Sequence, residues 1–322
     1  MSAAAGAPTQ GEVSLRVAAL LGRFLARRRS EMAAVDPVLT PMVDELQAVV
    51  GSGGKRVRPW LVVWGHLASG GAFEDPIATA GAAVELVHTF ALLQDDFMDA
   101  SATRRGRAAT HLAMGVSAAI LISDLALVWA DQLLCESGFA PDALLAGMRL
   151  FNSLRSDVTL GQYLDVTAVA DEDRALRVNR LKTASYTVLR PIQLGMVLAG
   201  APESLLAAVP AYAEPAGIAF QLRDDVLGAF GEASVTGKPA GDDLTRGKAT
   251  WLWARALRSG PPPEGLDERR RWIRESGALD DAEALIHRLE TAALAALAEL
   301  PIDTGLRGEL AAFTRDLVDR HL

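Results

Sequence analysis

The segment LLQDDFMD, at residues 92–99, is the most informative part of this sequence, because it sets three aspartates at the end of an apolar helical stretch. Residues four apart share one face of an α-helix, so Asp95 and Asp99 are expected to point the same way. Carboxylates held this close repel each other, and some take up protons unless a cation lies between them. An arginine pair, Arg104 and Arg105, follows and suits phosphate oxygens, because a guanidinium binds them in a bidentate manner.

A second aspartate pair follows another apolar stretch. The segment FQLRDD, at residues 220–225, ends in Asp224 and Asp225, and the segment GKP follows at residues 237–239. Oxygen ligands suit Mg²⁺, which in proteins usually binds one or two carboxylates, several waters and substrate phosphates. Two acidic groups, each followed by basic residues, therefore predict a site for a metal-bridged diphosphate.

The composition predicts a helical and acidic protein. The chain has 322 residues, of which 50% are hydrophobic and 6% aromatic, and its net charge is −8. Abundant alanine and leucine favour helix, and the negative charge argues against a general nucleic-acid surface. Cys135 is the only cysteine, so no intrachain disulfide can form, and a cytoplasmic location is expected. We expect a disordered leader at residues 1–12 and a single all-α domain over residues 13–322.

Helical periodicity dominates the chain, and strand alternation is nearly absent. Residues 113–130 are apolar enough to imitate a membrane span, but Asp124 within this stretch would cost roughly 2.5–3.5 kcal/mol in a bilayer. We therefore interpret the stretch as a buried or subunit-interface helix and expect no stable membrane insertion. The basic run at residues 27–29 is too short to favour an anionic membrane surface over a solvated helix face.

Nine short segments stand in the order typical of the trans-isoprenyl diphosphate synthases, the polyprenyl synthetase family, which this sequence resembles from about residue 51 to residue 250. Besides the two aspartate groups, Phe220-Gln221 and the arginine pair, they include GKRVRP at 54–59, ELVHT at 85–89, GQYLD at 161–165, KTA at 182–184 and GKPAGDDL at 237–244. A lone DDxxD is common on surface helices, whereas this ordered set is specific. The resemblance implies an all-α, isoprenoid synthase-type helical bundle around a deep central cavity.

The resemblance implies head-to-tail (1′-4) prenyl transfer. An allylic diphosphate loses pyrophosphate, the double bond of isopentenyl diphosphate attacks the resulting cation, and one proton is lost. Such an enzyme must stabilise the leaving diphosphate with Mg²⁺ and cationic side chains, and it must keep water from the cation. Three Mg²⁺ ions per active site are implied, and Mn²⁺ is expected to substitute. The metal ligands that the motif positions imply are Asp95, Asp96, Asp99, Asp224 and Asp225.

The motif positions also imply which side chains meet the two substrates. The isopentenyl diphosphate site is expected to contain Lys55, Arg58, His88 and Arg105. The allylic diphosphate site is expected to contain Arg104, Lys182, Lys238 and Lys248. Catalytic roles are expected for Lys182, Thr183, Gln221 and Lys238. Arg223, beside the second aspartates, is interpreted as a structural charge partner.

The second aspartate group departs from the family pattern at Gly228, where the last aspartate of a second DDxxD would stand. The metal site there is expected to lose one carboxylate, with Asp243 in the following loop as a candidate to assist through water. The sequence therefore predicts that Gly228→Asp lowers the Mg²⁺ concentration for half activity, provided that the helix geometry permits it.

Product length is expected to depend on two residues of the first aspartate helix. Phe90 stands five residues before Asp95, and Ala91 stands four before it. One helical turn is about 5.4 Å of depth, so a ring one turn higher or lower changes the product by about one isoprene unit. This pattern resembles geranylgeranyl diphosphate synthases, so a C20 product is favoured and a C15 product is the alternative.

Two other functions compete with a synthase. A class I terpene cyclase usually carries an Asn/Asp-Ser-Glu metal motif, which neither Asn152 nor Asn179 begins. A non-catalytic subunit of a heteromeric synthase usually lacks the first aspartates, which are intact here. We therefore predict an active prenyltransferase that uses isopentenyl and allylic diphosphates, and a homodimer whose interface includes residues 113–130.

Overall fold

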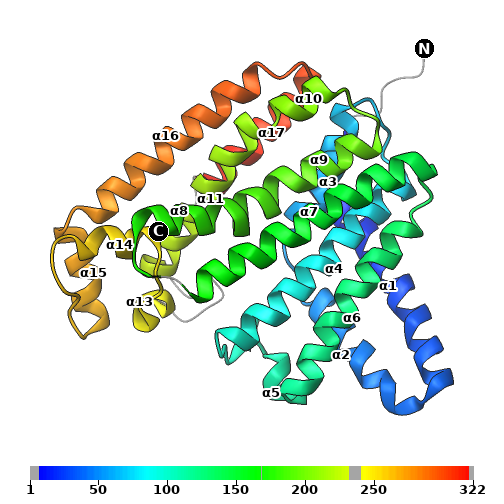
Figure 1. Ribbon diagram of the computed structural model, residues 1–322, viewed down its shortest axis with the longest axis horizontal. Helices are drawn as coiled ribbons and strands as arrows, with labels where there is room; N and C mark the ends of the chain where they lie inside the picture. Colours follow the sequence, from blue (N-terminus) through cyan, green and yellow to red (C-terminus); the bar gives the residue numbers. More distant parts are fainter. Residues whose placement is uncertain (1–6, 168, 232–240, 319–322) are drawn as a thin grey trace. The chain divides into compact units, whose positions relative to one another are not determined.

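The computed structural model describes residues 7–167, 169–231 and 241–318, and nearly all regular structure in these ranges is helical (Figure 1). The strands described there are β1 (Thr103–Arg104) and β2 (Arg107–Ala108), which pair in an antiparallel hairpin. The all-α prediction is confirmed, and the hairpin lies within the arginine-rich segment that follows the first aspartates. The chain divides into two compact units, residues 1–151 with 191–201 and residues 152–190 with 202–322. The single domain stays a prediction.

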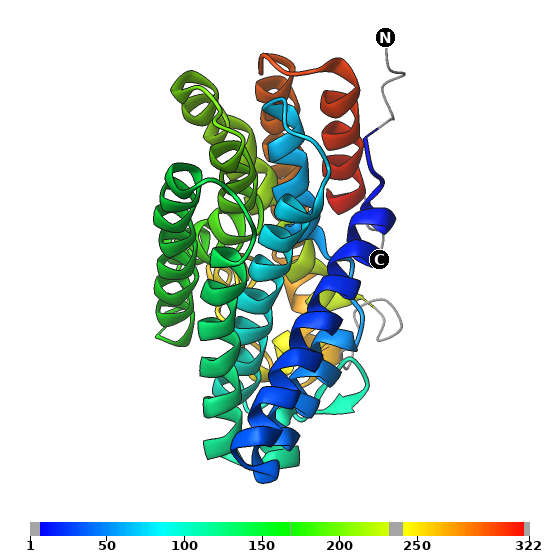
Figure 2. The same cartoon turned by 90° about the vertical axis from the view of Figure 1, so that its right-hand side faces the viewer.

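The first unit is built around α4 (Asp75–Met98), which packs against α6 (Val116–Cys135), α3 (Val57–Ala68) and α1 (Gln10–Val35). Small residues let the helices approach closely: a Cβ added at Gly81 of α4 would lie 3.3 Å from Pro59 of α3. Figure 2 shows α1, in dark blue, beside α2. The unit also contains η1 (Pro37–Leu39), α2 (Thr40–Gly51), α5 (Thr110–Met114), the beginning of α7 (Pro141–Val166) and most of α9 (Arg190–Leu198).

A capping box starts α1 earlier than the sequence predicts. The backbone N–H of Glu12 donates to Thr9 Oγ1 at 3.2 Å, and the N–H of Thr9 donates to Glu12 Oε2 at 2.7 Å. These two bonds satisfy amides that have no partner inside the helix. Residues 10–12, which we expected in the leader, are therefore helical; residues 1–6 lie outside the described ranges.

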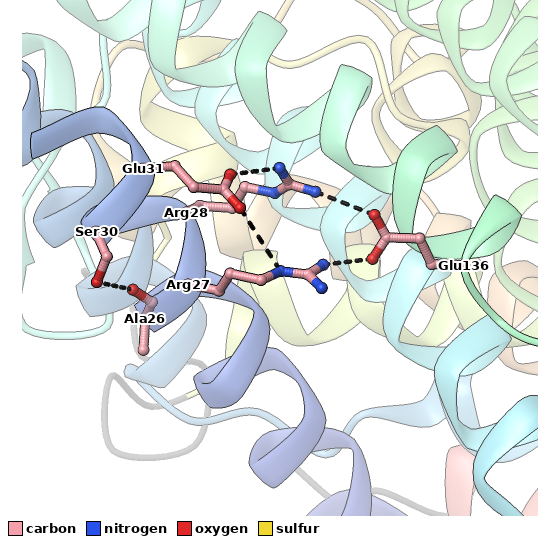
Figure 3. Close-up of polar contacts among 6 residues, drawn as sticks. All are labelled: Ala26, Arg27, Arg28, Ser30, Glu31 and Glu136. Carbon is pink, nitrogen blue, oxygen red and sulfur yellow. Dashed lines mark hydrogen bonds and ion pairs between the residues drawn. The ribbon is translucent and has the colours of Figure 1, made fainter. Parts of the chain in front are cut away.

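The basic run near the end of α1 is paired within the first unit, as Figure 3 shows. Arg28 donates to Glu31 at 2.6 Å and to Glu136, the C-cap residue of α6, at 3.1 Å. Arg27 also donates to Glu136. Arg29 pairs with Asp44 at 2.6 Å, so all three arginines are engaged by carboxylates of the same unit, which agrees with their interpretation as an ordinary charged helix face.

Within the described ranges, three helical stretches are long and apolar enough to cross a membrane by length and composition alone: Asp75–Met98, Val116–Cys135 and Glu203–Phe230. The first is the packed centre of its unit, with 72% of its most apolar window buried. α6 differs, because Leu121 and Val128 are 58% and 60% exposed. One side of α6 is therefore buried within the unit, whereas another side exposes apolar side chains.

The second unit is built around α11 (Pro210–Phe230), which packs against α16 (Ala278–Ala298) and the π-helix η2 (Asn179–Leu189). Figure 1 shows α16 in orange. The remaining helices are the end of α7, α8 (Glu172–Val178), α10 (Glu203–Ala208), α13 (Asp242–Arg246), α14 (Trp251–Leu257), α15 (Leu266–Glu275) and α17 (Thr304–Val318).

The π-helix η2 interrupts a stretch that helical periodicity predicts as ordinary α-helix. Two glycines bring its neighbours close to its backbone. A Cβ added at Gly161 of α7 would lie 2.7 Å from the backbone nitrogen of Lys182, and one at Gly217 of α11 would lie 2.3 Å from the Cα of Ala184. Segments of π-helix are rare and frequently lie at functional sites. Here the π-helix carries Lys182 and Thr183 between two closely packed helices.

Candidate functional site

The first aspartates lie at the C-terminal end of α4. Asp95 is half-buried, and Asp99 is the exposed C-cap residue. The N–H of Asp99 donates to the carbonyl of Asp95 at 2.8 Å, so the predicted helical spacing between the two residues holds. The negative end of the helix dipole disfavours carboxylates at this position. A cation bound there would relieve both that effect and the mutual repulsion.

Asp96, the second aspartate of this motif, is engaged by an arginine. Arg104 Nε donates to both oxygens of Asp96, at 2.9 and 3.2 Å, and the Asp96 side chain is only 5% exposed. Burial lowers the pKa of Arg104, but the hydrogen bonds and charge of Asp96 outweigh burial and raise that pKa overall. The structure thus brings together a predicted metal ligand and a predicted diphosphate ligand, and it pairs them with each other.

The β1–β2 turn presents Arg105. Arg105 and Gly106 have φ values of 50° and 76°, as the two central residues of a type I′ turn require. The Arg105 guanidinium donates to the carbonyl of Gly53 and lies against Gly54, where an added Cβ would be 2.8 Å from Nη2. Gly54 itself has φ 129°, which side chains rarely permit. The absence of a side chain at Gly54 therefore leaves room for the Arg105 guanidinium against the loop at residues 53–54.

Three of the predicted isopentenyl diphosphate residues gather beside this turn. Burial lowers the pKa of His88 well below its usual value, and the nearby charges of Arg58 and Arg105 lower it further. Burial also raises the pKa of Glu85, while Arg58 and Arg105 oppose that rise. Lys55 is exposed in the adjoining loop, and its carbonyl accepts from Gln10. Glu85 is a buried carboxyl group among these cations, and no role was predicted for it, although it stands in the ELVHT segment.

In the second unit, Lys182 of the π-helix pairs with Asp165 of α7. Lys182 Nζ donates to Asp165 Oδ2 at 2.7 Å. Burial alone would raise the pKa of Asp165, but the charges of Lys182 and Lys248 and the hydrogen bond from Lys182 lower it overall. Asp165 is the last residue of the GQYLD segment of the family resemblance. The structure makes it the partner of Lys182.

Gln221 links the π-helix to the second aspartates. The Thr183 hydroxyl donates to Gln221 Oε1, and Gln221 Nε2 donates to Asp225 Oδ1 at 2.9 Å. Burial raises the pKa of Asp225 to about 7, and the neighbouring charges of Asp243 and Asp224 add to the rise, while Lys248 and the Gln221 bond oppose it. A buried carboxylate beside two others holds a proton near neutral pH unless a cation replaces it.

Lys248 joins this group through its backbone and its charge. Its N–H donates to the carbonyl of Asp243 at 2.9 Å, and its charge acts on both Asp165 and Asp225. Two of the residues predicted for the allylic site, Lys182 and Lys248, therefore lie with the second aspartates, whereas Arg104 belongs to the first unit. The predicted role of Lys238 falls outside the described residues.

Arg223 has the structural role that the sequence predicted. Its Nη1 and Nη2 donate to the two carboxylate oxygens of Glu283 at 2.7 and 2.6 Å, and its Nε donates to the carbonyl of Val318 at 2.7 Å. These bonds tie α11 to α16 and to the end of α17. Arg223 therefore stabilises the contacts between these helices.

The two predicted chain-length residues lie half-buried on α4. Ala91 stands one helical turn before Asp95 on the same face, and Phe90 is its chain neighbour. Partial exposure leaves both side chains able to meet a bound hydrocarbon. Their effect on product length stays a prediction.

The donor chemistry of these groups fits magnesium. Every predicted metal ligand is a carboxylate, and hard oxygen donors are what Mg²⁺ prefers. In the parts of the chain that the structure describes, no group of three or more His, Cys, Asp or Glu side chains converges closely enough to hold a metal by itself. This agrees with an ion that keeps waters and takes its other ligands from a substrate diphosphate. The high pKa of Asp225 is a further reason for a cation at the second group.

Known proteins resemble this chain over most of its length. The Polyprenyl synthetase family model matches residues 40–287. A geranylgeranyl diphosphate synthase of Mycobacterium tuberculosis is 38% identical over 214 residues, which are 65% of this chain and 60% of that protein. A geranylfarnesyl diphosphate synthase of Aeropyrum pernix is 33% identical over 256 residues, 73% of this chain and 80% of that protein.

A solved structure agrees with these sequence matches. The crystal structure of geranylgeranyl pyrophosphate synthase from Corynebacterium glutamicum, complexed with isoprenyl diphosphate and magnesium, has a TM-score of 0.92 and 34% identity. It covers 98% of this chain and 100% of the other. Together the matches confirm the predicted family resemblance, the isoprenoid synthase fold class and the prenyltransferase class of enzyme. The roles of individual site residues stay predictions.

Proposed function

Because the chain belongs to the polyprenyl synthetase family, we propose that it condenses isopentenyl diphosphate with an allylic diphosphate, head to tail, to give geranylgeranyl diphosphate. The observation that carries this proposal is that each unit holds carboxylates beside a set of cations. The first unit has Asp95 and Asp99 near the arginine hairpin, and the second has Asp225 near Lys248. Two diphosphates and their counter-ions need two such sets.

The isopentenyl diphosphate is bound by Arg105, Arg58 and Lys55 in this proposal. Arg105 is held by the Gly53–Gly54 backbone, so its guanidinium is oriented before substrate arrives. His88 is neutral at neutral pH, because burial and its arginine neighbours lower its pKa. It therefore contributes a hydrogen-bonding ring without adding charge.

Metal dependence is a property of the family, and magnesium is the ion we propose here. When bound, Mg²⁺ neutralises the charge that develops on the leaving diphosphate. The carboxylates proposed to hold it are those of Asp95, Asp96, Asp99, Asp224 and Asp225, with three ions per active site and Mn²⁺ able to substitute. Asp96 also orients Arg104, which is proposed to bind the allylic diphosphate, since both oxygens of Asp96 accept from that guanidinium.

The π-helix and α11 prepare the allylic site. Asp165 orients Lys182, which carries a positive charge for the diphosphate. Gln221 accepts from Thr183 and donates to Asp225, so it fixes both the threonine hydroxyl and an aspartate expected to hold metal. Lys248 adds charge to the same group, and Lys238 is proposed to act with it.

A C20 product is the specific form of the proposal, and farnesyl diphosphate (C15) is the alternative. The relatives themselves carry names for different product lengths, geranylgeranyl and geranylfarnesyl. A class I terpene cyclase would release a cyclic hydrocarbon or alcohol from one diphosphate without using isopentenyl diphosphate. A non-catalytic subunit would be inactive without a partner chain.

We propose a homodimer that meets over α6. Leu121, Val128 and Val116 on this helix are 58%, 60% and 46% exposed, and such an apolar surface is typical of a protein interface. Cytoplasmic location, no membrane insertion and no nucleic-acid partner stay predictions.

The deciding experiment supplies radiolabelled isopentenyl diphosphate with dimethylallyl, geranyl or farnesyl diphosphate in Mg²⁺, followed by chromatography of the dephosphorylated products. We expect a C20 alcohol from all three primers and no incorporation after chelation. A C15 product that is not extended would support the alternative. No incorporation by a folded protein would overturn the synthase proposal.

A further inference from the structure

Position 228 departs from the family pattern, yet the space beside it is filled. Gly228 follows Asp224 by four residues on α11, so a side chain there would share its face. A Cβ added at Gly228 would lie 2.3 Å from Asp243 Oδ2 and 3.1 Å from Asp243 Cγ. The first distance is far shorter than van der Waals contact. The carboxylate of Asp243 therefore occupies the place that the first atoms of an aspartate at 228 would need.

We propose that Asp243 supplies the second metal site with the carboxylate that position 228 lacks. The inference rests on the proposed function, because it assumes a divalent cation beside Asp224 and Asp225. Asp243 reaches Gly228 of α11 from α13. A residue fifteen positions further along the chain thus provides the missing carboxylate. The sequence motif alone does not reveal this, because it shows only that position 228 has no carboxylate.

The backbone around Asp243 keeps its carboxylate at α11. Gly241, with φ 75°, precedes α13, and the N–H of Lys248 donates to the Asp243 carbonyl at 2.9 Å. Burial is the main cause that raises the pKa of Asp225, and the charge of Asp243 adds to that rise. Asp243 therefore belongs to the same electrostatic group as the two aspartates of α11.

This arrangement changes the expected result of restoring the family residue. The sequence predicts that Gly228→Asp tightens Mg²⁺ binding. The structure instead predicts that the new side chain meets Asp243, because both would need one volume and both carry negative charge. Gly228→Asp alone should therefore not tighten binding, whereas the same change should restore binding once Asp243 has been truncated.

The test is a cycle of four proteins: wild type, Gly228→Asp, Asp243→Ala and the double variant. Binding of Mn²⁺ in the presence of inorganic pyrophosphate is measured by electron paramagnetic resonance of the free ion, with circular dichroism as the folding check. Asp243→Ala should weaken binding by about 10- to 100-fold, the range reported for residues that support metal ligands. The double variant should recover most of that loss.

Two further variants separate the possible outcomes. Asp225→Asn reports whether the second group binds metal at all, so unchanged Mn²⁺ binding in that variant overturns the proposed site itself. If Asp225→Asn weakens binding but Asp243→Ala does not, Asp243 is not a replacement. Gly228→Ala displaces the Asp243 carboxylate without adding charge, so it should weaken binding as well. Gly228→Ala replaces the double variant in the test if the double variant does not fold. If a folded Gly228→Ala protein binds Mn²⁺ as wild type does, the inference is overturned.

Discussion

Arg104 donates through Nε to both carboxylate oxygens of Asp96, at 2.9 and 3.2 Å, and joins the arginine hairpin to the end of α4. The pair is mostly removed from water, since the two side chains are 22% and 5% exposed. Each residue was expected to touch a ligand directly. Their pairing means that the second aspartate of DDxxD and the first arginine act together.

This pairing predicts strong coupling between the two residues. Arg104→Ala leaves a buried carboxylate without its partner, which should cost roughly 3–5 kcal/mol of unfolding free energy. Asp96→Ala in the same protein should then cost less than it does in wild type, as denaturant unfolding of the four proteins would show. Arg29→Ala breaks an exposed pair with Asp44 and should cost at most about 1 kcal/mol. Additive losses for Asp96 and Arg104 would contradict the coupling.

The first metal group predicts a loss of turnover in Asp95→Ala. Asp95 is half-buried near the C-terminal end of α4, where we propose that its carboxylate holds a cation. Its removal should lower kcat in Mg²⁺ by at least about 100-fold, the effect of losing one preorganised charge-stabilising group. Asp142→Ala, on an exposed first turn of α7, is the matched control and should keep wild-type turnover. Near wild-type turnover of a folded Asp95→Ala protein would remove this residue from the site.

The fit between Gly54 and Arg105 predicts a substrate-specific defect in Gly54→Ala. The new methyl group would meet the guanidinium, and φ 129° disfavours alanine. Strain of roughly 1–3 kcal/mol at such a position corresponds to about 5- to 150-fold in an apparent constant. Steady-state kinetics should show this rise in KM for isopentenyl diphosphate, with a smaller change for the allylic substrate. Gly51→Ala, which meets open space and has ordinary helical geometry, should change neither constant.

The buried histidine predicts acid sensitivity of the fold. The native pKa of His88 lies well below its unfolded value of about 6.5, so its contribution to stability is present above that pH and is lost as the pH falls. The loss can reach roughly 1.4 kcal/mol per pH unit. Thermal unfolding between pH 7 and 5, without metal, should therefore show a smaller fall in Tm for His88→Gln than for wild type.

A histidine on the surface serves as the control for this titration. The side chain of His287 is 80% exposed, so His287→Gln should reproduce the wild-type pH profile. Asp225, whose pKa is raised to about 7, titrates with the opposite sign in all three proteins and cancels in the comparison. Parallel profiles for His88→Gln and wild type would show that His88 takes up its proton in the native state without penalty.

The position of Phe90 and Ala91 on α4 predicts opposite changes in product length. Phe90→Ala removes a ring and should lengthen the product to C25 or beyond. Ala91→Phe adds a ring on the face of Asp95 and should shorten the product to C15, because packed protein does not easily rearrange to admit it. Chromatography of the products reads both changes, with KM for isopentenyl diphosphate as the check on diphosphate binding. Active variants that both release the wild-type product would place the floor of the pocket on another helix.

Much of the site follows from the sequence because its motifs are local. DDxxD predicts its own geometry through helical periodicity, and the observed hydrogen bond from Asp99 to Asp95 agrees with it. Apolar periodicity likewise predicts an all-helical chain. The structural role of Arg223 was also predicted, although its partner, Glu283, stands 60 residues further along the chain.

The tertiary structure alone decided which side chains meet across long stretches of chain. Asp165 with Lys182, Gln221 with Thr183, and Asp243 with Gly228 are pairs whose contact depends on how three or more helices pack. The π-helix was also not predicted from the sequence, and Gly161 and Gly217 of its neighbouring helices approach its backbone closely. Local patterns determine helices and the chemistry they carry, whereas long-range packing determines which charges neutralise one another.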